Sequence, residues 1–407
     1  MNRREFLRCS LGASALWSMA PVTPRLLAQA AAHPALDPRG DTILVALQLS
    51  GGNDGLNCLV PFADDAYARA RPTLRRSRKQ VLPIDDRLGW HPRLRPLARL
   101  FDEGLLAVWQ GVGAPGQSRD HAAAMRAWHV ADPHPETHFT GWLGRAADRL
   151  LTRAPLLTPA AFVGRIPTPF VLNAARALVP AWAEPFNRDA TPDGPAADIP
   201  VVAETDHPLA RHIRAVAARA EADSRRLRAM SRERRPGQDG YPDFALAAEL
   251  RTVADLIRAD LGARIFVVEL GGGGIGGFDN HANQAGNHDA LLDQLARALE
   301  AFARDLRRDG LLDRVLLMTY SEFGRTVKEN GRHGTDHGLA GPVFLLGGGV
   351  RPGLRGEHPS LTDLDQGGLK ATADFRALYA AVLGPWLGLP SREILGARHA
   401  PLPLWSA

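Results

Sequence analysis

The chain has 407 residues, of which 45% are hydrophobic, and a formal net charge of +5. Four arginines against one glutamate give residues 1–30 a charge of +3, so the remainder is near +2, and we expect no nucleic-acid partner. Only one cysteine, Cys58, follows residue 30, which excludes an intrachain disulfide there. Stability must then come from a large core, in one large α/β domain or a domain with a cap.

The first thirty residues have the pattern of an export signal. RREFL (3–7) is followed by a mildly apolar run at 11–20 and a small-residue cleavage pattern at 28–30. This pattern resembles a twin-arginine signal peptide, and it predicts passage through the twin-arginine translocase to a periplasmic or extracellular location. An uncleaved anchor is the alternative. The apolar run is shorter than the roughly 20 residues that span a bilayer, so we expect no permanent membrane span.

The mature chain, residues 31–407, opens with a strand and a glycine turn. DTILVALQLSGGNDGLN (41–57) is a continuous apolar run that breaks into a Gly-Gly turn carrying Asp54. A helix is predicted over 91–104, where a glycine ends it, and a second strand over 105–113. These elements predict a βαβ opening.

The composition changes between about residues 150 and 240. Proline and alanine crowd the first part, and 207–235 is rich in arginine with apolar residues at near-helical spacing. We interpret 150–240 as an inserted helical or loop cap. The arginines of 207–235 are either a solvated helix face or a surface that collects anions. Further helices are predicted over 243–261 and 290–308.

Ligand-type side chains lie beside three predicted buried strands in the second half of the chain. The apolar runs are 264–270, 314–320 and 342–346. Loops at the ends of parallel strands bring together residues that are distant in sequence, so we expect these side chains to meet at one edge of one sheet and to bind a divalent metal. The residues concerned are Asp279, His281, Glu322, Asp336 and His337.

Five motifs in this order carry a resemblance to a known family. They are SGGNDGLN, GWLGR, GGFDNHANQ, SEFGRT and GTDHG, behind the twin-arginine leader. Together they resemble the uncharacterised exported family called domain of unknown function 1501. The resemblance implies membership of the alkaline phosphatase and sulfatase superfamily, with a mostly parallel α/β sheet flanked by helices and with metals at the carboxyl ends of its strands.

The resemblance also implies roles for individual residues. Asp54 resembles the superfamily's early metal-bridging aspartate. Asp279 and His281 resemble later ligands, although the familiar spacing there is Asp-x-x-x-His. His337 resembles the final histidine ligand, and Asp336 is a supporting carboxylate or a ligand in its own right.

The chain departs from the superfamily pattern directly after the predicted strand 314–320. Glu322 stands where the superfamily usually has aspartate, and Phe323 stands where it has histidine. A two-zinc site needs about three protein ligands for each metal. With one histidine missing, the expected cofactor is one or two divalent ions, with Zn²⁺, Ca²⁺, Mg²⁺ and Mn²⁺ all open.

The nucleophile predicted from the resemblance lies at the start of the helix after the second strand. Ser118 is the available hydroxyl there, with a helix N-cap as its alternative role. The family generally shows serine directly before the histidine, whereas this chain has Asp120 before His121. Arg119 and Arg325 are candidates for binding substrate oxyanions, or else form structural ion pairs.

Two functions follow from these observations. The first is a metal-dependent hydrolase of a small anionic ester, either sulfate or phosphate, with Ser118, Asp120, His121 and Arg325 as candidate catalytic residues. The second is a catalytically silent exported binding protein with the same fold, which has one structural metal and recognises an envelope component. Asp120 and Phe323 favour the second function, and the retained ligand-type residues favour the first.

Overall fold

The computed structural model describes residues 42–133, 138–153, 158–182, 240–260, 262–272 and 277–405. The predicted export signal and the arginine-rich segment 207–235 lie outside these residues. Within them, no helix combines the length and the apolar composition that crossing a membrane requires.

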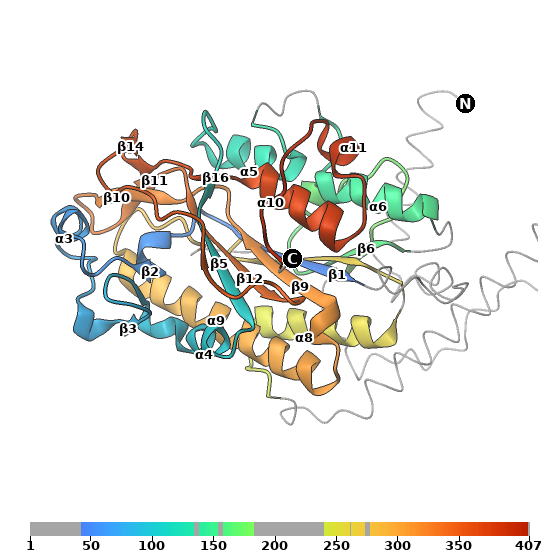
Figure 1. Cartoon of the computed structure of the whole chain (residues 1–407), viewed down its shortest axis with the longest axis horizontal. Coiled ribbons are helices and arrows are strands. Elements are labelled where there is room, and N and C mark those ends of the chain that lie inside the picture. The colour runs from blue at the N-terminus through green and yellow to red at the C-terminus, as the bar shows by residue number, and fades with distance from the viewer. Residues whose placement is uncertain are drawn as a thin grey trace, which may run out of the picture.

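The described residues form a central sheet, and its strands are mostly parallel (Figure 1). The order is β13-β5-β12-β9-β1-β8-β6-β7, with β16 also paired to β5. All of these pairs are parallel except the two that β12 makes with β5 and β9. The strands are β1 (Ile43–Leu49), β5 (Leu106–Gly113), β6 (Ala160–Val163), β7 (Ala181–Trp182), β8 (Ile265–Leu270), β9 (Val315–Tyr320), β12 (Gly341–Gly347), β13 (Gly353–Arg355) and β16 (Ala373–Asp374).

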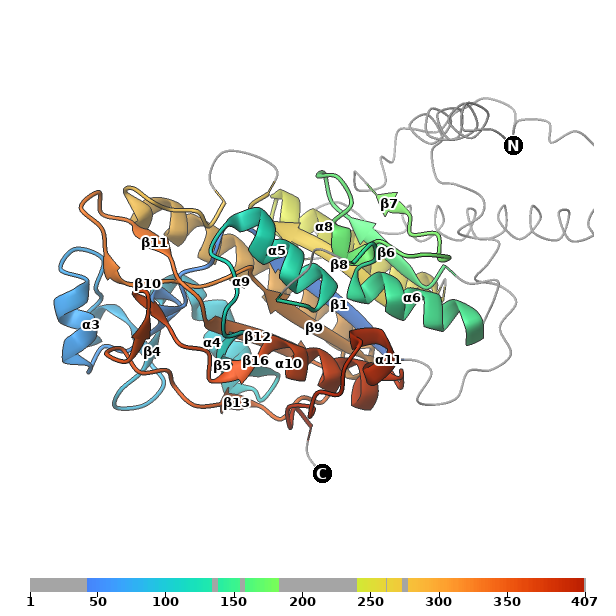
Figure 2. The ribbon, with the colours of Figure 1, turned by 90° about the horizontal axis from the view of Figure 1, so that it is seen from above.

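Helices cover both faces of this sheet, as the two views in Figures 1 and 2 show. One layer holds α4, α8 and α9, and the other holds α5, α6, α10 and α11. The fold is therefore the predicted α/β class, with a mostly parallel sheet flanked by helices. The helices are α4 (Arg95–Asp102), α5 (His121–Val130), α6 (Trp142–Arg153), α8 (Ala245–Ala259), α9 (Gln284–Arg308), α10 (Phe375–Ala381) and α11 (Ser391–Leu395).

Strand β1 shows why the sequence produces this architecture. All seven of its residues are buried, because each face of the strand meets a helical layer. Val45 and Leu47 pack in the core beneath α4, α8 and α9, whereas Leu44 and Ala46 pack on the opposite side with α6 and α10. A continuous apolar run with alternating partners is what a strand buried on both faces requires.

Two small sheets extend the fold at one end of the central sheet, next to helix α3 (Asp65–Ala70). The four-stranded sheet has the order β11-β10-β15-β14, and the three-stranded sheet has the order β2-β4-β3. Their strands are β11 (Thr335–His337), β10 (Arg325–Glu329), β15 (Gly368–Leu369) and β14 (Leu364–Asp365), then β2 (Leu59–Val60), β4 (Gly89–Trp90) and β3 (Leu82–Pro83).

The structure corrects the predicted opening of the chain. Helix α4 does connect β1 toward β5, but β5 does not pair with β1, because β9 and β12 lie between them in the sheet. The elements at 41–113 are therefore not an adjacent βαβ unit. The short strands β2, β3 and β4 also interrupt the connection. Strand order depends on contacts with strands more than 200 residues away, which the local pattern does not contain.

Part of the predicted cap belongs to the sheet. Residues 158–182 contribute β6 and β7, and β6 pairs with β8 in parallel register, Ala160 opposite Ile265. The proline- and alanine-rich composition of this segment hid two strands at the sheet edge. Residues 183–239, the rest of the predicted cap, lie outside the described residues, so the cap remains a prediction there.

Candidate metal centre

Four chain segments bring ligand-type side chains to one end of the sheet. His121 is the first residue of α5, and Asp279 and His281 lie in the loop between β8 and α9. Glu322 follows β9 directly, and His337 ends β11. Because β12 runs antiparallel to β9, the segment that precedes β12 reaches the same edge as the residues that follow β9. This arrangement brings GTDHG to the other motifs.

Asp279 lies at the middle of the cluster. Its Oδ1 atom is 3.0 Å from His281 Nε2 and 3.3 Å from His337 Nε2, and its Oδ2 atom is 3.3 Å from His121 Nε2. The Nε2 atoms of His281 and His337 are 2.9 Å apart. Two ligands of a tetrahedral ion with bonds of 2.0–2.1 Å are separated by about 3.3 Å. The ligand atoms of His121, Asp279 and His337 all lie within 4.8 Å of one another, so these three residues are the group that could hold one ion.

The three histidines share one orientation. Each has its Nδ1 atom bonded to a protein acceptor and its Nε2 atom directed toward Asp279. The acceptors are Glu322 for His121, Asp336 for His281 and the Arg119 carbonyl for His337, at 2.9, 3.1 and 2.7 Å. Metal-binding histidines show this pattern, because the acceptor fixes the tautomer and leaves the other nitrogen free to bind the metal.

His121 pairs with Glu322, the most buried carboxylate of the cluster. The Glu322 carboxylate is only 3% exposed, and it also accepts a hydrogen bond from Gly51 N at 2.8 Å. The hydrogen bond with Glu322 raises the pKa of His121. His121 Nε2 is buried and, among the described residues, has no hydrogen-bond partner, since its contact with Asp279 lacks hydrogen-bond geometry. Buried polar nitrogens without a hydrogen-bond partner are uncommon, which makes His121 Nε2 a candidate metal ligand.

Asp336 and Phe323 hold the other two histidines in place. Asp336 Oδ1 also accepts from Asn330 Nδ2 at 3.0 Å, and this bond, with that of His281, lowers the pKa of Asp336. Asn330 donates a further bond to the His281 carbonyl at 3.0 Å. Phe323 stacks on His337 with ring centroids 4.7 Å apart. Both side chains therefore support the histidines from outside the cluster.

Arg325 acts inside the protein, away from the surface where a substrate would bind. Its side chain is 0% exposed, and it donates to the carbonyls of Gly52, Phe278 and Thr335 and to Asp279 Oδ1 at 2.7 Å. Burial would raise the pKa of Asp279, but Arg325 outweighs it and lowers that pKa. The structure thus favours the ion-pair alternative for Arg325, which positions Asp279.

The structure does not bring Asp54 into the cluster. Its two carboxylate oxygens accept hydrogen bonds from Arg71 at 2.6 and 2.8 Å, and one of them accepts a third from Gln284 at 2.5 Å. Burial would raise the pKa of Asp54, but the charge and hydrogen bonds of Arg71, together with His288 and Gln284, lower it. With both oxygens engaged, Asp54 is left out of the ligand set that we propose.

Ser118 and Asp120 have local roles at the start of α5. Asp120 is the helix N-cap, with its carboxylate accepting from Ala123 N at 2.9 Å. Ser118 accepts from Asp120 N at 3.1 Å, so the N-cap role expected for this serine belongs to Asp120. Within the described residues, neither side chain forms a hydrogen bond or ion pair with the histidines of the cluster. His121, which was predicted as a catalytic residue together with Ser118 and Asp120, does lie in the cluster.

Sequence reasoning missed Asn330, which supports the centre, and the two residues that bind Asp54 outside it. Asn330, Arg71 and Gln284 belong to no motif that a single sequence reveals, and their contacts arise only in the folded chain. Glu322 was expected as a ligand, yet its hydrogen bonds make it a partner of His121. The one available signal for Asn330 is its place in the short NGRHG turn that leads to GTDHG.

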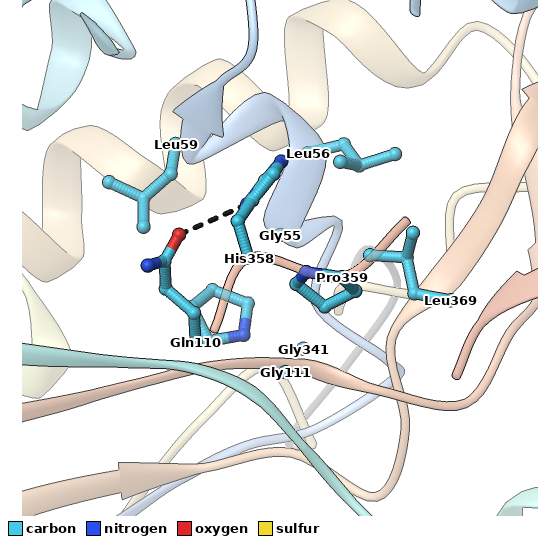
Figure 3. Close-up of a pocket in the computed structure, with 10 residues that line it drawn as sticks. Gly55, Leu56, Leu59, Gln110, Gly111, Gly341, His358, Pro359 and Leu369 are labelled. Atoms are coloured by element: carbon cyan, nitrogen blue, oxygen red, sulfur yellow. Dashed lines mark hydrogen bonds between the residues drawn. The ribbon is translucent and has the colours of Figure 1, made fainter. Parts of the chain in front are cut away.

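A separate small cavity lies away from these residues (Figure 3). Its volume of ≈ 20 Å³ holds about one water molecule, and its lining is mainly apolar. Within it, His358 Nδ1 is 3.0 Å from Gln110 Oε1, and burial lowers the pKa of His358. This cavity is too small for an ester substrate, whereas the histidine cluster is partly open, with the Asp279 side chain 43% exposed.

Three solved structures are similar to the chain at low identity. A protein in the alkaline phosphatase superfamily from Vibrio parahaemolyticus has 10% identity and a TM-score of 0.41, covering 94% of this chain and 79% of that one. The C-terminal periplasmic domain of EptC from Escherichia coli, in complex with Zn, has 10% identity and a TM-score of 0.39, covering 77% and 74%. The lipoteichoic acid synthase LtaP from Listeria monocytogenes has 10% identity and a TM-score of 0.38, covering 85% and 79%.

Comparison with curated protein sequences finds no match. Comparison with protein families does find one, over residues 108–383, which include the motifs GWLGR, GGFDNHANQ, SEFGRT and GTDHG. The match covers more than half of the chain and confirms the resemblance predicted from these motifs. The chain belongs to the family described as protein of unknown function (DUF1501).

Proposed function

We propose that the protein is an exported, metal-dependent hydrolase of an anionic ester, either a sulfate or a phosphate. The observation that carries this proposal is the common orientation of His121, His281 and His337 around Asp279. Three imidazoles with their Nδ1 atoms held by protein acceptors are arranged for binding a cation. The partly open face of the cluster gives a substrate access to it.

The donor set favours one ion. Imidazole nitrogens with one carboxylate suit Zn²⁺, or another transition metal, better than Ca²⁺ or Mg²⁺, which prefer oxygen ligands. His121, Asp279 and His337 would hold it, with His281 beside Asp279 and His337. Such an ion supplies polarisation of the ester oxygen and a water of lowered pKa. Asp54 offers no free carboxylate oxygen for a second ion, which supports a single metal.

The protein groups around the centre have distinct tasks in this proposal. Glu322 and Asp336 orient His121 and His281, and Arg325 fixes the Asp279 carboxylate. Ser118 is bonded to Asp120 N and takes no part in the cluster contacts. We therefore propose direct attack by water, without a covalent serine intermediate.

A second function is favoured by one observation. Phe323 stands where the superfamily has a histidine, and it fills that space by stacking on His337. A protein that kept one structural metal and bound an envelope component would tolerate this change. Binding of metal without hydrolysis is the outcome that would distinguish this function from the first.

Metal content and activity test the proposal together. Purified mature protein should contain about one metal ion per chain by mass spectrometry and hydrolyse members of a panel of aryl sulfates, phosphomonoesters and phosphodiesters. Asp279→Ala and His337→Ala should lose both properties. His138→Ala is the matched control, since His138 lies 2.9 Å from Asp132 in a half-buried pair outside the cluster. Full metal content in the two cluster variants would refute the ligand set.

Export is a separate part of the proposal, and it rests on residues 1–30. Replacing Arg3 and Arg4 with lysine in the full chain should leave the protein in the cytoplasmic fraction, because the twin-arginine pathway reads the arginine pair. The measurement is fractionation of cells that carry the normal or the altered leader. Equal secretion of both forms would contradict the twin-arginine route and leave the metal centre unaffected.

A further inference from the structure

Six exposed cations form a surface beside the centre, which we call the basic rim. All six are exposed, and none forms an ion pair with another residue in the described part of the chain. They are Arg69, Arg75, Arg78, Lys79, Lys328 and Arg332. We propose that the basic rim binds an anionic polymer that carries repeated sulfate or phosphate groups, and that this polymer is the substrate of the neighbouring centre. The inference rests on the proposed function.

Hydrogen bonds attach the basic rim to the walls of the centre. Residues 69–79 lie against β10, since Thr73 Oγ1 donates to Glu329 Oε1 at 2.9 Å and is 3.2 Å from His333 Nδ1. The Arg332 carbonyl accepts from Asn283 N at 2.9 Å, two residues after His281. Figures 1 and 2 both show α3 next to the β10–β11 hairpin. An anion on the rim therefore lies next to the histidine cluster.

The arginines between α4 and α9 are paired, in contrast to those of the rim. Arg99 donates to Glu300 at 2.9 and 2.7 Å, and Arg304 and Arg307 both bind Glu103. These pairs neutralise their charges locally. The rim therefore differs from the α4–α9 surface in carrying a group of neighbouring cations without ion pairs.

The rim keeps a positive excess when its carboxylates are counted. Asp64 and Asp65 at the start of α3 and Asp336 beside Arg332 are exposed, so six cations face three carboxylates. Of these three, Asp64 is bonded to Ala66 N and Asp336 to Asn330. The net positive charge of the rim attracts anions and concentrates them near the metal centre.

The extent of the rim favours a polymer over a small ester. One ester group needs only the centre, whereas cations spread over residues 69–79 and the β10–β11 hairpin fit negative charges repeated along a chain. A lipid surface would also require exposed apolar side chains among the cations. The exposed large hydrophobic residues of the described chain are Phe139 and Leu178, and neither belongs to the rim segments.

A binding experiment tests this inference without using catalysis. The probe is fluorescent dextran sulfate, with neutral dextran as the blank, and the readout is anisotropy at about 50 to 200 mM salt. The test variant combines Arg75→Glu, Lys79→Glu and Lys328→Glu. Its matched control makes the same charge change at the C-terminal end of the chain, at three exposed arginines: Arg351→Glu, Arg392→Glu and Arg398→Glu.

The expected results separate this inference from the proposed function. Wild-type binding should weaken steeply with salt, and the test variant should bind about tenfold or more weakly at the lowest salt, with a smaller salt slope. The control should stay near wild type. The His337→Ala variant should still bind the polymer, even if hydrolysis fails for every ester. Equal losses in the test and control variants, or unchanged binding of dextran sulfate by the test variant, would overturn the inference.

Discussion

Two aspartates at the same edge of the sheet have similar partners and opposite surroundings. Asp54 follows β1 and binds Arg71, and Asp279 follows the neighbouring parallel strand β8 and binds Arg325. Both arginines are 0% exposed. The Asp54 side chain is 3% exposed, whereas that of Asp279 is 43% exposed.

The difference between them lies in what else reaches the carboxylate. Asp54 receives only hydrogen-bond donors, from Arg71 and Gln284, and these occupy both of its oxygens. Asp279 receives one arginine and three histidine nitrogens whose other ring atoms are already bonded. A buried ion pair with satisfied donors is structural, whereas a carboxylate with imidazole lone pairs around it is suited to a cation.

The largest expected effect is on the stability of the protein when the buried Asp54 is replaced. Asp54→Ala leaves the Arg71 charge buried without its partner, which should lower the free energy of unfolding by about 3–5 kcal/mol. Asp279→Ala should cost less, because its side chain is partly exposed and Arg325 keeps four backbone acceptors. Urea denaturation measures both. Adding Arg71→Met to Asp54→Ala should recover part of the loss, and equal losses in the two alanine variants would contradict the contrast.

The second effect concerns metal binding at the cluster around the partly exposed Asp279. Glu322→Gln removes the charge that orients His121, so affinity for metal should fall by about 10- to 100-fold, as is typical when such a supporting group is lost. Titration of the metal-free protein with Zn²⁺ gives the affinity. Glu329→Gln is the matched control, since Glu329 is a buried glutamate that bonds Thr73 and Leu74 outside the cluster. An equal fall in the control would show that Glu322 acts only through stability.

Acid should destabilise the folded protein through the buried region around Asp54. His288, beside Asp54, has its pKa lowered by burial to about 4, so it stays neutral in the folded protein. In the unfolded chain His288 has a pKa near 6.5 and binds a proton below that pH. The stabilising contribution of neutral His288 is therefore present above pH 6.5 and is lost as the pH falls toward 4. This histidine alone should contribute a loss of about 2 kcal/mol between pH 7 and pH 5.

The control for the acid prediction replaces the titrating group. His288→Gln keeps a polar side chain near Asn53, to which His288 Nε2 lies at 3.2 Å, and removes the charge. Unfolding free energies at pH 7 and pH 5 should then differ less in this variant than in wild type. The same pH slope in both proteins would assign the acid sensitivity to another group.

The sequence predicted individual strands better than it predicted which strands pair with each other in the sheet. Continuous apolar runs identified β1, β8, β9 and β12, because a strand buried on both faces contains few polar residues. The antiparallel direction of β12, the position of β5 and the edge strands β6 and β7 depend on contacts between distant segments. Local patterns carry no information on those contacts.

The same limit applies to the candidate site. His121, Asp279, His281 and His337 were all expected near the centre, because their residue types and motifs indicate chemistry. The role of Asp54 was not predictable, since Arg71, its partner 17 residues away, belongs to no recognisable motif. A residue type indicates what a side chain is able to bind, and only the fold decides which partner reaches it.

The smallest expected effect is at Ser118, and it tests whether a serine takes part. Its hydroxyl contacts only Asp120 N in the described structure, and Asp120 itself caps α5. Ser118→Ala should therefore change kcat/KM less than twofold, and the free energy of unfolding by less than about 0.5 kcal/mol. Asp120→Ala, in contrast, should cost about 1 kcal/mol because it removes the helix cap. A loss of hydrolysis in Ser118→Ala with unchanged metal content would restore the serine as nucleophile and replace direct attack by water with a covalent intermediate.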